Sequence, residues 1–216
     1  MPDHDMTRTE SNTWPVWLVV VAWAALVLSL SALGVFAMDP RKPPLPLLAA
    51  VLIPPILFLV AYALSAKVRA VALSRDLRLL TALQAWRVIG GMFLVLMWLG
   101  LLPGTFAWPA GVGDLIVGAY APFVAVAVSR HTPGWRTQVV VLNVLGLLDF
   151  VGAIGGGVMS GGSPLGILRG DVPVDIMQQL PLSIIPTFGV PFWIVLHIIS
   201  LIKIRNPQTA ADKPAA

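Results

Sequence analysis

Three charged side chains, Arg87, Asp114 and Asp149, stand inside long apolar stretches of this sequence. On insertion scales a charge at the centre of a bilayer costs about 2.5–3.5 kcal/mol, so such residues usually face the interior of a helix bundle, pair with one another and mark functional sites. A carboxylate in such a position can bind a cation or a proton, or pair with an arginine. The neighbouring helices are therefore expected to supply counter-charges to Arg87.

Arg87 lies nine positions after Arg78, the last basic residue before the apolar run 79–102. At a helical rise of 1.5 Å per residue it is roughly 13 Å deep, which is too deep for its side chain to reach the membrane surface easily. Gln84, Arg87 and Gly91 are spaced i, i+3 and i+7, so they share one helix face. Because glycine lets another helix approach closely, a partner helix is predicted on that face.

Asp149 lies thirteen positions after Arg136, roughly 20 Å into an apolar layer about 30 Å thick. A short carboxylate at that depth must be protonated or paired. Its depth differs from that of Arg87 by roughly 6 Å, a distance that an extended guanidinium can bridge, so the sequence predicts a salt bridge between these two residues.

Asp114 is roughly 24 Å deep by the same count, and the predicted Arg87–Asp149 pair would leave it without a counter-charge. It would then be able to bind a cation or a proton from the outer side. The alternative is that Asp114 lies near the headgroups in the first turn of its helix, where the helix dipole favours an acid.

Other polar side chains are expected to extend this site into a polar track. His197 could relay protons, or it could donate a hydrogen bond to a carbonyl of a neighbouring helix. By depth the polar residues form a stagger and not a ring. The candidate substrate- or ion-binding residues are Gln84, Arg87, Asp114, Asn143, Asp149 and His197.

The composition indicates which elements must position these residues. Of 216 residues, 57% are hydrophobic and 11% are charged, whereas soluble domains carry about 25% charged residues. A membrane-spanning helix needs about 20 apolar residues, and the sequence has six such runs. These runs are 14–38, 45–66, 79–102, 110–129, 139–159 and 182–202. The predicted fold class is all-α: a polytopic integral membrane protein with a bundle of six transmembrane helices.

The basic residues predict the orientation of the chain. Of 14 Lys and Arg residues, ten fall on the side of both termini, three on the other side, and Arg87 within the membrane. By the positive-inside rule both termini are cytoplasmic, in a plasma or bacterial inner membrane. We expect one transmembrane domain over 14–203 between disordered tails at 1–13 and 204–216. Within it, Ser74 is expected to cap the third span and Pro54-Pro55 to kink the second.

The sequence offers little for enzyme chemistry. It has no Cys, which excludes disulfides, thiolate nucleophiles, Cys-ligated zinc and iron–sulfur clusters. It has neither a Gly-x-Ser-x-Gly elbow nor paired His at ligand spacing. No catalytic residue, metal site or cofactor is therefore predicted. Because the basic residues are scattered over several loops, nucleic acid is not expected as a partner.

Two functions remain open from the sequence. The first is a transporter or channel for a small solute or an ion, with or without a coupled proton, because ionisable residues within membrane spans commonly mark such paths. The alternative is a non-catalytic membrane subunit or scaffold, in which the polar cluster is structural and the small-residue faces pack against a partner membrane protein or a second copy. Apart from the lipid bilayer, the expected partners are thus a solute, a cation or proton, or another membrane chain.

Overall fold

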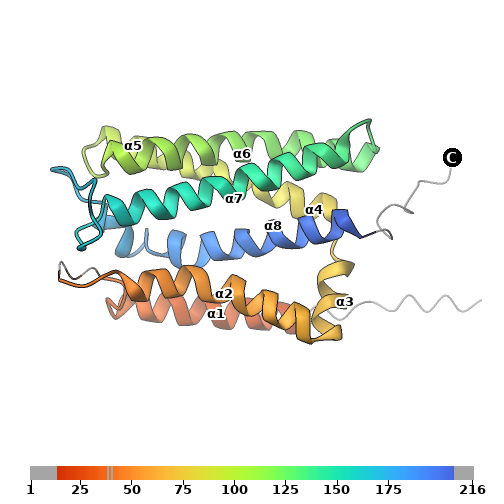
Figure 1. Cartoon of the computed structure of the whole chain (residues 1–216), viewed down its shortest axis with the longest axis horizontal. Coiled ribbons are helices and arrows are strands. Elements are labelled where there is room, and N and C mark those ends of the chain that lie inside the picture. Colours follow the sequence, from red (N-terminus) through yellow and green to blue (C-terminus); the bar gives the residue numbers. More distant parts are fainter. Residues whose placement is uncertain (1–13, 38, 40, 207–216) are drawn as a thin grey trace, which may run out of the picture.

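The computed structural model describes residues 14–206 apart from 38 and 40, and these residues form an all-α bundle (Figure 1). The first helices are α1 (Trp14–Ala32), α2 (Leu45–Leu64), α3 (Ala66–Ser74) and α4 (Leu77–Ala82). They are followed by the 3₁₀ stretch η1 (Leu83–Gly91), α5 (Met92–Trp98), α6 (Gly104–Arg130) and α7 (Trp135–Met159). The last described elements are the 3₁₀ turn η2 (Asp175–Gln178), the π-helical η3 (Ile185–Gly189) and α8 (Val190–Arg205).

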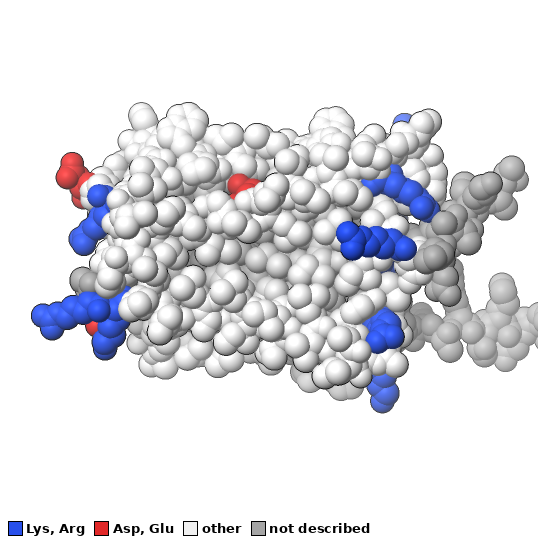
Figure 2. Space-filling model, in the orientation of Figure 1, with Lys and Arg blue, Asp and Glu red and all other residues white. Residues whose placement is uncertain are grey.

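Six of these stretches are long and apolar enough to cross a membrane, which confirms the predicted all-α class and the predicted number of candidate spans. The third span combines α4, η1 and α5, and the sixth combines η3 and α8. Lys and Arg lie at the two ends of the molecule, with an almost uncharged band between them (Figure 2). This pattern is the one that a bilayer requires, while the cytoplasmic placement of the termini remains a prediction.

Several boundaries differ from the expectation. Ser74 does not cap the third span, because residues 66–74 form a separate helix; Asp76 is the cap, and its side chain accepts a hydrogen bond from the Arg78 N–H at 2.7 Å. Residues 103–109, which separate the predicted runs 79–102 and 110–129, are largely helical, since α6 begins at Gly104. α2 continues as one helix through Pro54 and Pro55, and the kink expected there stays a prediction.

The tails expected at 1–13 and 204–216 fall mostly outside the described residues. At the C-terminal side the structure describes the chain as far as Asn206, and α8 continues to Arg205, two residues into the stretch expected as a tail.

The core of the bundle lies around α6, which packs against the third span and α7. α8 lies next to α7 on one side and next to α2 on the other (Figure 1). α1 is joined to the rest at its inner face, where the Trp23 and Phe188 rings lie 4.6 Å apart and Ser183 Oγ donates to Ser31 Oγ at 3.1 Å. The third to sixth spans therefore surround the bundle interior.

Candidate functional site

The third span carries Arg87 on an irregular segment. η1 is nine residues of 3₁₀ helix, whereas 3₁₀ runs longer than three or four residues are uncommon and often mark a hinge or strain. α6 comes very close to this segment, since a Cβ on Gly118 would lie 2.6 Å from the backbone nitrogen of Val88. Glycine at position 118 therefore allows α6 to approach the backbone that presents Arg87.

The guanidinium of Arg87 is buried and bonded along its edges. Its Nε donates to Oδ1 of Asp114 on α6 at 2.7 Å, its Nη2 donates to Oδ2 of Asp149 on α7, and its Nη1 donates to the carbonyl oxygen of Gly146 at 3.2 Å. The ring of Phe150 covers one face, with its centre 3.9 Å from the Arg87 Cζ. A cation–π contact of this kind gains strength when it is removed from water.

A second set of hydrogen bonds runs from Arg87 through His197 of α8. Arg87 Nη1 lies 3.3 Å from His197 Nε2, and because a guanidinium can only donate, Nε2 must accept. The imidazole proton is then on Nδ1, which donates to Oδ1 of Asn143 at 2.7 Å. The Asn143 amide in turn donates to the carbonyl of Val139 at 2.7 Å. This pattern fits a neutral histidine that links the guanidinium to the backbone of α7.

Glycines provide the space for these contacts. A Cβ on Gly146 would lie 2.8 Å from Arg87 Nη1 and would also collide with the His197 ring. Cβ atoms on Gly90 and Gly113 would collide with the carboxylates of Asp114 and Asp149. The Arg87 cluster, which we define as Arg87, Asp114, Asn143, Asp149 and His197, is therefore packed directly against helix backbone.

The predicted Arg87–Asp149 salt bridge is confirmed. Two expectations about Asp114 are wrong: it is not left unpaired, since it bonds Arg87 at 2.7 Å, and it is not in the first turn of a helix, since α6 starts ten positions earlier at Gly104. The predicted stagger in depth stays a prediction. The depths were counted along straight helices rising 1.5 Å per residue, whereas a 3₁₀ stretch such as η1 rises about 2.0 Å per residue.

Gln84 is the one candidate residue that stays outside this network. It is buried, yet neither its Oε1 nor its Nε2 forms a hydrogen bond to the described part of the chain. Buried amide groups are ordinarily hydrogen-bonded, so Gln84 provides an unused donor and acceptor one turn before Arg87.

Sequence reasoning missed two contributors to the site, the Gly146 carbonyl and the Phe150 ring. The sequence did carry a signal for both. Gly146 and Phe150 follow the candidate residue Asn143 at i+3 and i+7, so all three lie on one face of α7.

The Arg87 cluster contains one guanidinium and two carboxylates. If both carboxylates are ionised, it carries one excess negative charge. The side chain of Arg87 is 1% exposed, while those of Asp114 and Asp149 are 15% and 12% exposed. Acidic atoms reach the surface of the apolar band (Figure 2). The arrangement can therefore accept a proton or a cation at a carboxylate; among the described residues, no group of three or more His, Cys, Asp or Glu is suited to a metal ion.

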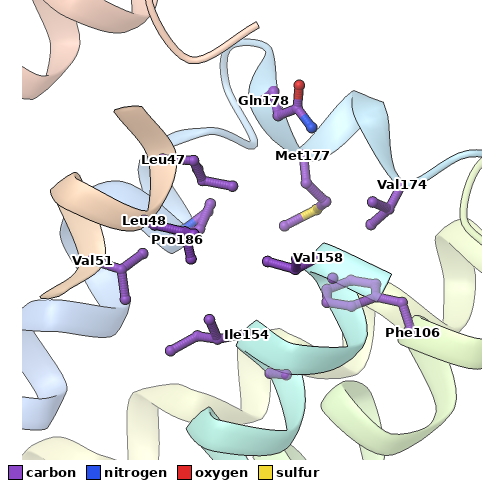
Figure 3. A pocket seen from close by; sticks show the side chains of 12 residues that line it. Leu47, Leu48, Val51, Phe106, Ile154, Val158, Val174, Met177, Gln178 and Pro186 are labelled. Atoms are coloured by element: carbon purple, nitrogen blue, oxygen red, sulfur yellow. The ribbon is translucent and has the colours of Figure 1, made fainter. Parts of the chain in front are cut away.

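Two cavities lie away from the Arg87 cluster. One, of about 60 Å³, is apolar and is bounded by Val51 of α2, Ile154 of α7 and Met177 of η2 (Figure 3). The other, of about 480 Å³, lies where α3 meets α4, beside the ends of α6 and α8. Neither of these two cavities is lined by a residue of the Arg87 cluster.

Six apolar helices around a buried arginine, carboxylate and histidine cluster define a multi-pass membrane protein with a polar interior. Residues 43–205, well over half of the chain, match the model of the family described as Domain of unknown function (DUF8737), and the chain belongs to this family. The match begins after α1 and includes the whole Arg87 cluster. No curated protein and no solved structure that was compared with the chain matches it.

Proposed function

We propose that this protein moves a small solute or an ion across a membrane, as a transporter or channel, and that the Arg87 cluster is its binding site. The observation that carries the proposal is one guanidinium shared by two carboxylates, Asp114 and Asp149, from two different helices. A single arginine balances one of these charges, so a bound proton or cation balances the other. Ionisable residues that face the interior of a membrane bundle commonly form ion paths and proton relays.

Irregular helices near the cluster support the proposal. The third span is interrupted by the 3₁₀ stretch η1, which carries Arg87, and the sixth span begins with the π-helical η3. Binding sites in transporters are typically built from discontinuous helices, and π segments occur frequently at functional sites. Both irregular segments belong to spans that contribute to the cluster.

The residues then have distinct roles. Asp114 and Asp149 exchange the proton or cation, and Arg87 holds the two carboxylates in place. The neutral His197, bonded to Arg87 and Asn143, holds the guanidinium in place beside them. The unpaired amide of Gln84 provides a hydrogen-bonding group for a solute or a water molecule.

A structural role is the second candidate, and two observations favour it. The two cavities lie away from the cluster, and four hydrogen bonds of Arg87 are satisfied within the protein. In this case the cluster would hold the third to sixth spans together in a membrane subunit. The large apolar surface of α1 would then face lipid or a partner chain.

Flux measurements in proteoliposomes test the transport proposal. The purified full chain is reconstituted, a membrane potential is imposed, and proton, Na⁺ and K⁺ movement is followed with indicator dyes. Asp114→Asn and Asp149→Asn are each expected to reduce the flux by at least roughly tenfold, the usual scale for an essential proton-transfer group being 10²–10⁴. Asp39→Asn is the matched control, because Asp39 is exposed and pairs with Lys42 in a loop. Unchanged flux in both cluster variants would remove the proposed site, and flux absent from the wild type would favour the structural role.

A further inference from the structure

The larger of the two cavities, about 480 Å³ in volume, is polar and lies at one end of the bundle. Five elements meet there: the end of α3, the start of α4, the end of α6, the start of α7 and the last turns of α8. We call it the basic cavity, after the charged and aromatic residues among those that line it: Arg75, Asp76, Arg78, His131, Trp135 and Lys203. It shares no residue with the Arg87 cluster.

The basic cavity has an excess of positive charge. Among the described residues that line it, Arg75, Arg78 and Lys203 are cations and Asp76 is the one carboxylate. Asp76 also caps α4, and its Oδ2 lies 3.6 Å from Nη2 of Arg78. The Arg78 side chain is 62% exposed and the Asp76 side chain 53%. The pair is therefore weak, and an incoming anion can compete with it.

Backbone contacts hold two of the cations at the cavity wall. Lys203 donates to the carbonyl of Leu73, and Arg75 Nε donates to the carbonyl of Val71 at 3.1 Å. The two Nη groups of an arginine form a planar fork that matches the oxygens of a phosphate, and lysine adds a point charge. A cation from the end of α3 and one from α8 are thereby presented to one volume.

The position of the cavity selects the kind of anion. The cavity lies at one end of the spans, beyond the apolar band that they cross (Figure 2). This end corresponds to the level of the lipid headgroups. Trp135 belongs to its wall, and tryptophan rings favour this level of the membrane. Basic pockets between transmembrane helices bind anionic headgroups, and a volume of several hundred cubic ångströms fits a small ligand.

We propose that the basic cavity binds a phosphate group, carried either by an anionic phospholipid headgroup or by free phosphate. Arg75 and Arg78 bind the phosphate oxygens, Lys203 adds charge from α8, and Trp135 packs at the rim. A bound phosphate bridges the third and sixth spans at their ends. The alternative is that these basic residues only orient the chain in the membrane, and in that case any pair of charges at this end would be equivalent.

The chain offers a matched control for that alternative. Lys67 and Arg69 lie on α3 at the same end of the bundle but do not line the cavity. Arg69 instead donates to the carbonyl of Ala63 at 3.0 Å and lies over the Tyr62 ring. Replacing either pair with glutamine removes two positive charges, but only one replacement removes them from the cavity wall.

The test uses the purified full chain in detergent. It is titrated with phosphatidylglycerol or phosphatidylcholine, and bound lipids are counted by mass spectrometry of the intact complexes. The wild type is expected to prefer phosphatidylglycerol or, if free phosphate is the ligand, to lose bound lipid when inorganic phosphate is added. Arg75→Gln/Arg78→Gln is expected to weaken binding roughly thirtyfold, at about 1 kcal/mol for each basic residue. Lys67→Gln/Arg69→Gln is expected to leave it nearly unchanged.

A change of shape without a change of charge provides a second test. Ser129→Trp fills the cavity from the end of α6 and retains every basic residue, so it is expected to abolish lipid and phosphate binding alike. Displacement of the lipid by inorganic phosphate identifies free phosphate as the ligand, while retention identifies the headgroup. The proposal is overturned by equal losses in the two glutamine pairs, by full binding in Ser129→Trp, or by a wild type with neither lipid preference nor phosphate competition.

Discussion

The molecule places similar ion pairs in two contrasting surroundings. In the Arg87 cluster, Arg87 Nε and Asp114 Oδ1 lie 2.7 Å apart with side-chain exposures of 1% and 15%, whereas Arg78 and Asp76 in the basic cavity lie 3.6 Å apart with exposures of 62% and 53%. Water and salt screen the exposed pair, which is worth about 0–1 kcal/mol. Removing one partner of a buried pair leaves a charge without compensation. The same residue types therefore hold helices together in the interior and remain available to a ligand at the end.

Arg87→Leu should have the largest effect on this comparison. It leaves the largely buried Asp114 and Asp149 without a cation, and breaking a buried ion pair in this way costs about 3–5 kcal/mol. We expect a large fall in the thermal unfolding temperature in detergent and little monodisperse protein by gel filtration.

The triple variant Arg87→Leu/Asp114→Asn/Asp149→Asn is the control, since it removes all three charges together. It should recover a substantial part of the lost stability, because uncharged side chains leave no buried charge to compensate. Unfolding of Arg87→Leu at the wild-type temperature would mean that the buried pairs contribute nothing to stability.

Alanine substitutions at two glycines of α7 should have the next largest effect on stability. An Ala Cβ at position 146 would meet the His197 ring and lie 2.8 Å from Arg87 Nη1, whereas a Cβ at Gly152 would meet nothing within 4 Å. Gly146→Ala should destabilise the protein by about 1–3 kcal/mol through overpacking. Gly152→Ala should be neutral or stabilise it by up to about 1 kcal/mol, since alanine favours a helix. Equal unfolding temperatures of the two variants would contradict the tight packing at position 146.

The fold and half of the ion-pair geometry could be predicted from the sequence. Six spans followed from the length of the apolar runs, because lipid requires about 20 apolar residues per helix. The Arg87–Asp149 pair followed because each residue is too deep to be solvated and the axial gap is within reach of an arginine. Both inferences follow from the properties of the surrounding lipid and depend little on how the helices pack.

The pairing of Asp114 could not be predicted in the same way. A depth counted at 1.5 Å per residue cannot detect the 3₁₀ stretch η1, nor the start of α6 at Gly104. The close approach of α6 to η1 at Gly118 depends on tertiary packing, and so do the satisfied His197 and the unpaired Gln84. The basic cavity combines residues from five elements, so charge counts along the chain revealed its residues but not their common site.

Asp76→Ala tests the two roles of Asp76, which caps the start of α4 and places a negative charge in the basic cavity. The Asp76 side chain accepts the Arg78 N–H at 2.7 Å at the start of α4, and loss of such a cap costs typically about 1 kcal/mol. We expect a small fall in the unfolding temperature together with tighter binding of anionic lipid, since a negative charge leaves the basic cavity. Asp76→Asn retains a capping acceptor and should restore the stability while the lipid binding stays tight.

Arg78→Gln should have the smallest effect on stability, and it completes the comparison when set beside Arg87→Gln. The two substitutions are chemically identical and fall on one span, but only Arg87 is buried between carboxylates. Arg78→Gln should change the unfolding free energy by less than about 0.5 kcal/mol, as exposed substitutions usually do, and Arg87→Gln by several times more. Anionic-lipid binding should respond in the opposite order. Equal unfolding temperatures for the two variants would show that burial does not make Arg87 more important for stability than Arg78. The Arg87 cluster would then not be what holds the spans together.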